Sequence, residues 1–239
     1  MSTFTSFQPA ALKFLRQLKR NNNREWFAAN KQTFEDELLA PMRLFVEEMD
    51  VRCASFAPEI IGDPKRSIFR IYRDVRFSKD KSPYKTHGSF WMTHQSAGHG
   101  VGSETHGAGA GFYFHLEPNV SLVAGGVWMP PRDRLALIRE SLLKDHRPLE
   151  RALSGTAFKR RFSRLSEEGM LKRTPRGVDP DHPAAEYLRR VSFTVSAPIS
   201  NEDVTSKSLA DRVEKDFRLM LPFVRWLNSS LGYPPKERR

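Results

Sequence analysis

The stretch "GFYFHLE" (residues 111–117) alternates apolar and polar side chains along its whole length. Successive side chains of a β-strand point to opposite faces of the sheet, so this pattern predicts a strand with two different faces. The apolar face would carry Phe112, Phe114 and Leu116. The polar face would carry Tyr113, His115 and Glu117. Such a strand is typical of a sheet that is covered by helices on its apolar side.

Other stretches have the same strand character. Residues 69–77 ("FRIYRDVRF") alternate, with Arg70, Tyr72, Asp74 and Arg76 on the polar side. Further strand candidates are residues 88–94, 110–117, 121–128 and 191–195. A short "PN" turn at 118–119 joins two of these strands. Adjacent strands with short connections predict an antiparallel sheet that begins at residue 67 and runs to 128.

Helical patterns flank the predicted sheet at residues 9–55, 132–154 and 201–228. Pro9 is suited to the first turn of a helix, "NNN" at 21–23 ends that helix, and Asn23 can cap the next one. Apolar residues then recur at the helical spacing: Met42, Phe45, Val46, Met49 and Cys53. We therefore expect a single α+β domain over residues 1–239, mainly an antiparallel sheet with helices packed on it.

The composition restricts the class of protein. The chain has 239 residues, of which 39% are hydrophobic, and this is enough to form a core. A formal net charge of +11 favours anionic partners. The first residues contain no apolar run typical of a signal peptide and no stretch could span a membrane, so we expect a soluble, cytoplasmic protein. Cys53 is the single cysteine, which excludes an intrachain disulfide and a thiolate metal site.

The polar face of the predicted sheet is the first candidate site. If residues 69–77 and 111–117 belong to one sheet, their polar side chains share a face able to bind an anion or transfer a proton. The candidate catalytic residues are Tyr72, Asp74, His115 and Glu117. The alternative is that this face only contacts water, as one face of an antiparallel sheet often does.

The second candidate site is the basic stretch of residues 65–85. Eight Lys and Arg residues against Asp74 and Asp80 give it a net charge of +6. Charge-assisted hydrogen bonds from such side chains hold anions well. The candidate ligand-binding residues are Arg70, Arg73, Arg76, Lys79, Lys81, Tyr84 and Lys85. A solvated basic loop is the alternative. Residues 159–176 form a second basic region that could follow a nucleic-acid backbone, and solvation is the alternative there.

The Gly-rich stretch at residues 94–111 contains His94, His99 and His106. It offers neither a cysteine nor a regular histidine spacing, and it has no glycine pattern for binding phosphate. We expect a mobile hairpin loop here and assign no metal site from the sequence.

Five motifs resemble one known family. They are "FLRQLKRNNNREWFAANK", "FRIYRDVRFSKDKSPYKTH", "GFYFHLEP", "GGVWMP" and "DHPAAEYLRR". Together they resemble the uncharacterised bacterial and fungal family named domain of unknown function 2461, over nearly the full length. The resemblance implies a single α+β domain, and no established activity comes with it. The family's motif positions here are Asn23, Arg24, Trp26, Phe27, Arg70, Arg73, Asp74, Arg76, Lys79, Lys81, Tyr84 and Lys85. The Gly/His insertion at 95–109 departs from the family, which favours His115 over the inserted histidines.

Three functions are open at this point. The first is binding of an anionic, phosphate-bearing small molecule at the polar sheet face, with hydrolase or transferase activity as an option. The second is a nucleic-acid-binding module that uses both basic regions. The third is a protein-interaction domain whose charge serves solubility. A closed positive pocket would favour the first, and a long positive stripe would favour the second. The sequence assigns no cofactor and no oligomeric state.

Overall fold

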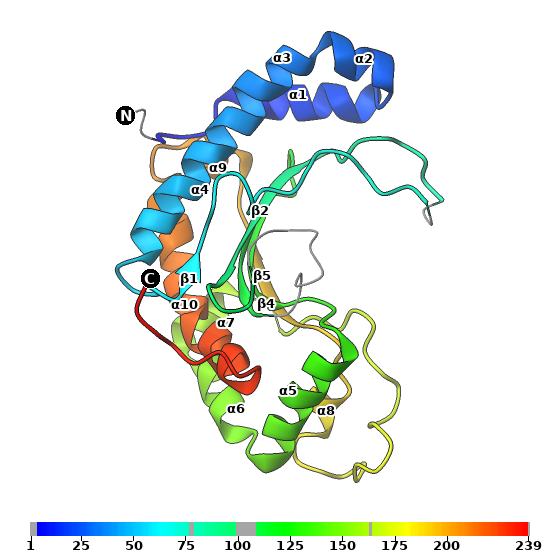
Figure 1. Cartoon of the computed structure of the whole chain (residues 1–239), viewed down its shortest axis with the longest axis vertical. Coiled ribbons are helices and arrows are strands. Elements are labelled where there is room, and N and C mark those ends of the chain that lie inside the picture. The colour runs from blue at the N-terminus through cyan, green and yellow to red at the C-terminus, as the bar shows by residue number, and fades with distance from the viewer. Residues whose placement is uncertain (1–3, 77–78, 99–108, 163, 239) are drawn as a thin grey trace.

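The computed structural model describes residues 4–76, 79–98, 109–162 and 164–238. At its centre is a five-stranded antiparallel sheet in which the strands lie in chain order. The strands are β1 (Ile60–Ile61), β2 (Gly88–His94), β3 (Gly111–Leu116), β4 (Leu122–Val127) and β5 (Phe193–Pro198). The predicted α+β class, an antiparallel sheet with helices packed on it, is confirmed (Figure 1).

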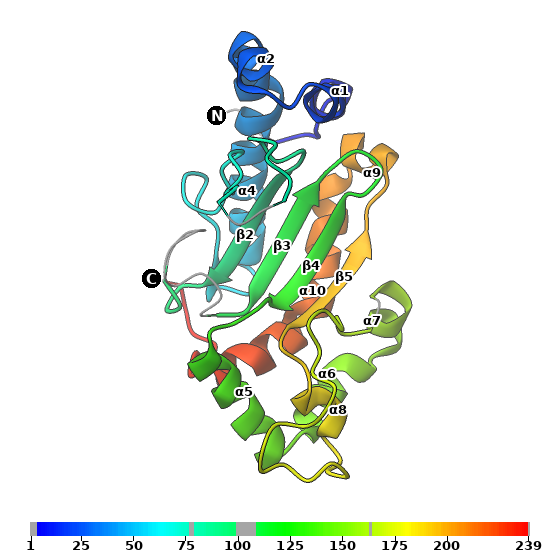
Figure 2. The ribbon, with the colours of Figure 1, turned by 90° about the vertical axis from the view of Figure 1, so that its right-hand side faces the viewer.

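The register of the strands fixes which side chains share a face. Trp91 lies opposite Tyr113, and Tyr113 lies opposite Ala124. Ser89 lies opposite His115, and Ala124 lies opposite Ser196. Directly opposed residues point to the same side of an antiparallel sheet, so all of these side chains line one face. We call it the open face, and Figure 2 shows it toward the viewer.

Helices cover the other face. α4 (Ala40–Cys53) and α10 (Leu209–Ser230) run behind the sheet in Figure 2. The ring of Phe112 stacks on Phe217 of α10 at 4.4 Å, and Phe114 packs edge-on against Phe45 of α4 at 4.9 Å. All four rings are fully buried. The apolar half of the β3 alternation therefore forms the core, as predicted.

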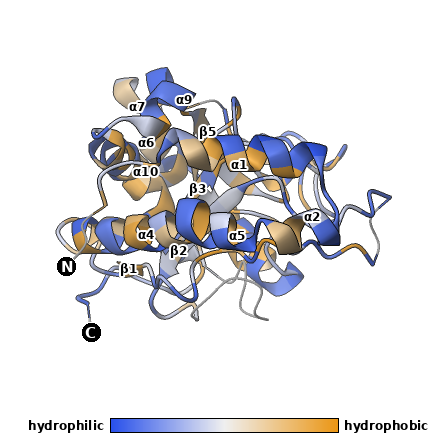
Figure 3. Cartoon of the chain, turned by 90° about the horizontal axis from the view of Figure 1, so that it is seen from above, coloured by the Kyte–Doolittle hydropathy of each residue, from blue (hydrophilic) through white to orange (hydrophobic). Residues whose placement is uncertain are grey.

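The first helices form a projecting layer. α1 (Pro9–Arg20) turns its hydrophobic side toward its neighbours and its hydrophilic side outward (Figure 3). Asn23 caps α2 (Arg24–Ala29), because its side chain accepts a hydrogen bond from the Trp26 amide at 2.9 Å. α3 (Lys31–Phe34) passes through a π-helical turn (Glu35–Leu39) into α4 without a break. Pro41 follows the π-helical turn inside this continuous helix. Because proline has no amide hydrogen, the helix lacks one main-chain hydrogen bond at this point.

The remaining helices follow β4 and β5. α5 (Arg132–Lys144), α6 (Arg147–Ser154) and α7 (Thr156–Arg161) come between them, with the short α8 (Ala185–Leu188) just before β5. The stretch predicted as one closing helix at 201–228 is two helices, α9 (Asn201–Thr205) and α10, separated by a turn at 206–208. Ser200 caps α9 through a reciprocal capping box with Asp203.

Residues 69–76 do not form the strand predicted at 69–77, of which residue 77 lies outside the described residues. Only the segment next to Ser67 borders the sheet, where the Phe69 amide donates to the Ser89 carbonyl at 3.0 Å. Beyond it the chain leaves the sheet and folds back on itself, with Tyr72 paired to Tyr84. We call residues 70–85 the basic arm; its described parts extend away from the strands (Figure 1). Alternation arises in any extended chain, so it cannot tell a sheet strand from an arm.

Cys53 is buried in α4, and burial raises the pKa of its thiol far above the usual value. None of the described helices combines the length and the apolar content needed to traverse a bilayer.

Candidate functional site

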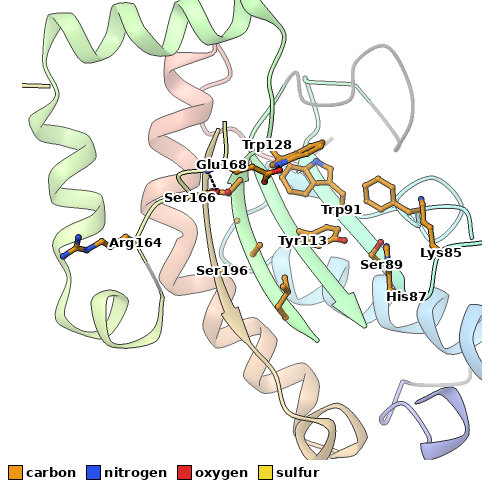
Figure 4. Close-up of a pocket in the computed structure, with 15 residues that line it drawn as sticks. Lys85, His87, Ser89, Trp91, Tyr113, Trp128, Arg164, Ser166, Glu168 and Ser196 are labelled. Atoms are coloured by element: carbon orange, nitrogen blue, oxygen red, sulfur yellow. Dashed lines mark hydrogen bonds between the residues drawn. The ribbon is translucent and has the colours of Figure 1, made fainter. Parts of the chain in front are cut away.

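A cavity of about 760 Å³ lies on the open face of the sheet (Figure 4). Strands β2 to β5 form its floor, and the chain that follows α7 forms one wall. Its described lining residues are Phe69, Lys85, His87, Ser89, Trp91, Tyr113, Leu122, Ala124, Gly125, Trp128, Arg164, Ser166, Glu168, Thr194 and Ser196. The volume is within the range of small-molecule sites.

Aromatic rings dominate the walls of the cavity. Trp91 and Tyr113 project from neighbouring strands with ring centroids 6.4 Å apart, and Phe69 meets Tyr113 edge-on at 6.0 Å. The indole of Trp128 is 52% exposed, and its Nε1 donates to Glu168 Oε2 at 3.1 Å. Such rings offer flat surfaces for an apolar or aromatic part of a ligand.

Lys85 provides positive charge at the edge of the cavity. Its ammonium group lies 5.2 Å from the centre of the Phe69 ring, a cation–π contact. Burial lowers the pKa of Lys85, and the nearby charge of Arg70 lowers it further. Within the described residues no carboxylate forms an ion pair with Lys85. By contrast, the guanidinium of Arg164 points away from the sheet (Figure 4).

A chain of polar side chains runs along β3 beside the cavity. The hydroxyl of Tyr113 lies 3.0 Å from His115 Nδ1, and His115 Nε2 lies 3.2 Å from Glu117 Oε2. In the neutral tautomer with a proton on Nε2, His115 accepts from Tyr113 and donates to Glu117. Thr86 and Lys19 donate to the other oxygen of Glu117 at 3.3 and 3.5 Å. Tyr–His–Glu arrangements of this kind can transfer a proton.

His87, the residue before β2, lies next to this chain. Its ring lies 4.2 Å from that of His115, centre to centre. Burial lowers the pKa of His87 to about 4, and the adjacent His115 adds to the effect. Burial also lowers the pKa of His115. Burial opposes ionisation of Glu117, yet its hydrogen bond with His115 and the surrounding positive charges hold its pKa below the usual value.

Side chains that could together bind a metal ion gather at one place among the described residues. His87, His115 and Glu117 each present a donor atom, and these atoms lie within 4.8 Å of one another. His94 is used elsewhere: it is buried and hydrogen-bonded to the Pro234 carbonyl at 3.0 Å. His99 and His106 lie outside the described residues.

The structure separates the candidate residues that the sequence placed together. His115 and Glu117 lie beside the cavity, and Lys85 lines it. Tyr72 and Asp74 belong to the basic arm and are exposed, so the expectation that Asp74 and His115 share a sheet face is wrong. Asp74 instead pairs with Arg76, and the hydrogen bonds from that guanidinium lower the pKa of Asp74 to about 2.

The other candidate residues of the basic arm lie away from the cavity. Arg73 pairs with Asp80, and Lys81 donates to the Val75 carbonyl at 2.9 Å. Tyr84 is buried against Phe27, with ring centroids 4.1 Å apart. The structure leaves Arg70, Arg76 and Lys79 exposed. Of the seven candidate ligand-binding residues, Lys85 is the one that lines the cavity.

Sequence reasoning missed His87, Trp91 and Trp128. Trp91 lies on the same face of β2 as Ser89, so the period-two rule applied to residues 88–94 would have pointed to it. His87 immediately precedes β2 and continues the same alternation by one step. Trp128 and the wall at 164–168 carry no such signal, because only the folded chain brings them over the sheet.

The fold and cavity define an α+β protein with a one-sided helical layer and an open antiparallel sheet face. The chain belongs to the family described as "Conserved hypothetical protein (DUF2461)", whose model matches residues 10–226. This confirms the resemblance in the sequence motifs. Comparison with curated proteins and with solved structures gives no match.

Proposed function

We propose that this protein binds a small anionic molecule that carries an aromatic or planar apolar group, in the cavity on the open face. The observation that carries the proposal is Lys85, a partly buried ammonium group without a paired carboxylate among the described residues, at the edge of an aromatic-walled cavity. A buried charge without a partner is costly, and an anionic ligand would supply the partner.

The cavity lining matches both parts of such a ligand. Trp91 and Trp128 suit a flat apolar group, whose removal from water favours binding. The hydroxyl-bearing residues Ser89, Ser166, Thr194 and Ser196 line the same cavity. Hydroxyl donors together with one ammonium group are suited to a phosphate or carboxylate.

The shape of the site favours a small ligand over a nucleic acid. The charge at the cavity is concentrated at Lys85, whereas the second basic region is partly occupied by internal contacts. Arg161 of that region donates to Asp216 at 2.7 Å and to the Pro198 carbonyl at 3.1 Å. A nucleic-acid module needs a continuous track of free cations along its surface.

Beside the cavity, the Tyr113–His115–Glu117 chain supplies acid–base chemistry for a hydrolase or transferase. His115 is hydrogen-bonded on both ring nitrogens and so connects a hydroxyl donor to a carboxylate. This arrangement supports proton transfer to or from a bound ligand. Release of phenolate from a chromogenic aryl phosphate tests for it, and substitution of His115 by Asn should abolish that release.

The binding test compares three probes by thermal shift at low salt: phenyl phosphate, inorganic phosphate and phenol. We expect phenyl phosphate to stabilise most. At a hundredfold excess over Kd, binding adds about 2.7 kcal/mol, a rise of roughly 5–10 °C in Tm. Lys85→Met should remove the response to both phosphates, and the matched control Lys81→Met should keep it. Equal responses of the two variants would overturn the proposal.

Single-stranded and duplex DNA serve as the competing probes. Binding to a nucleic acid would weaken steeply with salt, with a log–log slope near −0.9 for each phosphate contact. We expect no such binding at about 50 mM salt. Tight, salt-sensitive DNA binding together with no response to phenyl phosphate would replace our proposal with the nucleic-acid module.

A further inference from the structure

The rings of His87 and His115 and the carboxylate of Glu117 converge at one end of the sheet. His87 immediately precedes β2, and the other two residues stand two apart on and just after β3. Their donor atoms lie within 4.8 Å of one another, and all three residues are partly buried. Converging nitrogen and oxygen donors that are shielded but not sealed are suited to an ion that also contacts solvent or a ligand.

We propose that His87, His115 and Glu117 form a binding site for a divalent transition-metal ion of the Zn²⁺ class. Two imidazoles and one carboxylate are the donor set of open zinc and non-haem iron sites, which keep positions free for water or substrate. Mg²⁺ and Ca²⁺ prefer oxygen ligands alone, so the two histidines argue against them.

The outer hydrogen bonds leave the correct atoms free for the ion. Tyr113 Oη is 3.0 Å from His115 Nδ1, and His115 Nε2 lies on the side of Glu117. Metal binding takes the other neutral tautomer: Nδ1–H donates to Tyr113, and the unprotonated Nε2 is the ligand atom in place of its hydrogen bond to Glu117. Thr86 and Lys19 occupy Oε1 of Glu117, which leaves Oε2. Metal-binding histidines and carboxylates are commonly held by such partners.

The spacing of the donors agrees with this assignment. His115 Nε2 and Glu117 Oε2 are 3.2 Å apart. Two ligands about 2.1 Å from a tetrahedral ion lie roughly 3.4 Å apart, so this pair is already at ligand spacing. His87 lies on the connection before β2. Rotation of its side chain would bring its ring nitrogen to the same distance and complete the three ligands. The ion would then lie beside the cavity that His87 lines.

The test uses the untagged chain, stripped with a chelator and dialysed against ZnCl₂ or MgCl₂, with bound metal measured by mass spectrometry. We expect one Zn²⁺ per chain and no comparable Mg²⁺ binding. His115→Ala and His87→Ala should each lower Zn²⁺ affinity at least about tenfold, in line with the loss of a ligand or its support. Zinc bound equally by wild type and by both variants would overturn the proposal, as would no stoichiometric zinc.

His146→Ala is the matched control. His146 Nε2 lies 3.7 Å from Glu150 Oε1, so it is another histidine beside a glutamate, remote in sequence from the site. Its removal should leave Zn²⁺ affinity unchanged, and a loss equal to that of His115→Ala would mean nonspecific histidine binding and overturn the assignment.

Co²⁺ provides a readout that a loss of folding cannot imitate. Co²⁺ bound in a low-coordinate nitrogen–oxygen site absorbs strongly in the visible region, and we expect that spectrum for wild type. Glu117→Gln preserves size and shape, so it should remain folded by circular dichroism while its Co²⁺ spectrum is lost or shifted. An unchanged spectrum in folded Glu117→Gln would remove Glu117 from the ligand set. The site does not depend on the anion proposal, because Lys85 is not a ligand.

Discussion

The ammonium group of Lys85 lies 5.2 Å from the centre of the Phe69 ring, at the edge of the cavity, and burial lowers the pKa of that ammonium group. In the protein without ligand this contact is the compensation that the structure shows for a poorly solvated charge. Lys85 therefore links the stability of the protein to the presence of a ligand.

We predict that Lys85→Met raises Tm at pH 7 when no ligand is present. The pKa of Lys85 is lowered in the folded protein, so between that pKa and the unfolded value of about 10.4 the unfolded chain binds more protons. Stability consequently rises with pH across this window, and the full penalty is present below it. Melting curves should show the advantage of Lys85→Met shrinking toward pH 10, whereas Lys81→Met shows no such trend.

Trp128 should determine selectivity for the apolar part of the ligand. Trp128→Ala removes a half-exposed aromatic wall that is worth about 0.5–1.5 kcal/mol in ring contacts. By calorimetry we expect roughly 3- to 10-fold weaker binding of phenyl phosphate and unchanged binding of inorganic phosphate. Trp226→Phe, on α10 at the covered side of the sheet, should change the affinity for neither probe. If Trp128→Ala weakens the binding of both probes equally, Trp128 does not contact the apolar part of the ligand.

Asn228 should be among the least replaceable residues of the core. Its side chain accepts from the Ala110 amide at 2.8 Å and donates to the Ala110 carbonyl at 3.1 Å, and Asn228 is buried. Asn228→Ala leaves both main-chain groups unpaired, at about 1–3 kcal/mol each in the free energy of unfolding. Urea titration measures the loss, with Ser230→Ala on the same helix as a control that should cost little.

Asp74→Asn should leave Tm and phenyl phosphate binding unchanged, because Asp74 and Arg76 are both exposed on the basic arm. Asp216→Asn is the contrasting variant. The buried Asp216 carboxylate pairs with Arg161 through two hydrogen bonds, so its removal should cost about 3–5 kcal/mol by urea titration. A large stability loss in Asp74→Asn would show that the arm packs more tightly than its exposure indicates.

The sequence predicted β3 well because the alternation of its side chains arises from one cause, the burial of one face of the strand. Phe112 and Phe114 are buried by helices and His115 is not, so burial and alternation agree residue by residue. The basic arm failed for the opposite reason. There the buried Tyr84 packs against Phe27 of α2, and the Ile71 carbonyl accepts from the Lys85 amide within the arm. Local spacing does not show which partner an extended segment will have.

The candidate site was predicted in part. His115 and Glu117 follow from β3 alone, and Lys85 follows from local charge. His87 immediately precedes the neighbouring strand β2, and its place beside His115 depends on the pairing of Ser89 with His115. The pairing register and the position of the wall at 164–168 depend on contacts between distant parts of the chain. The periodicity of a single segment does not predict them.

The order of the strands also has a consequence for how the protein folds. β2, β3 and β4 are close in sequence, whereas β5 pairs with β4 across the whole segment 128–192. Because closing a long loop costs entropy before any contact repays it, we expect β5 to dock late. Thr194 and Ser196 of β5 help to line the cavity, so the ligand site comes into existence only with that last step. A ligand would therefore slow unfolding of this chain by holding its most distant strand in place.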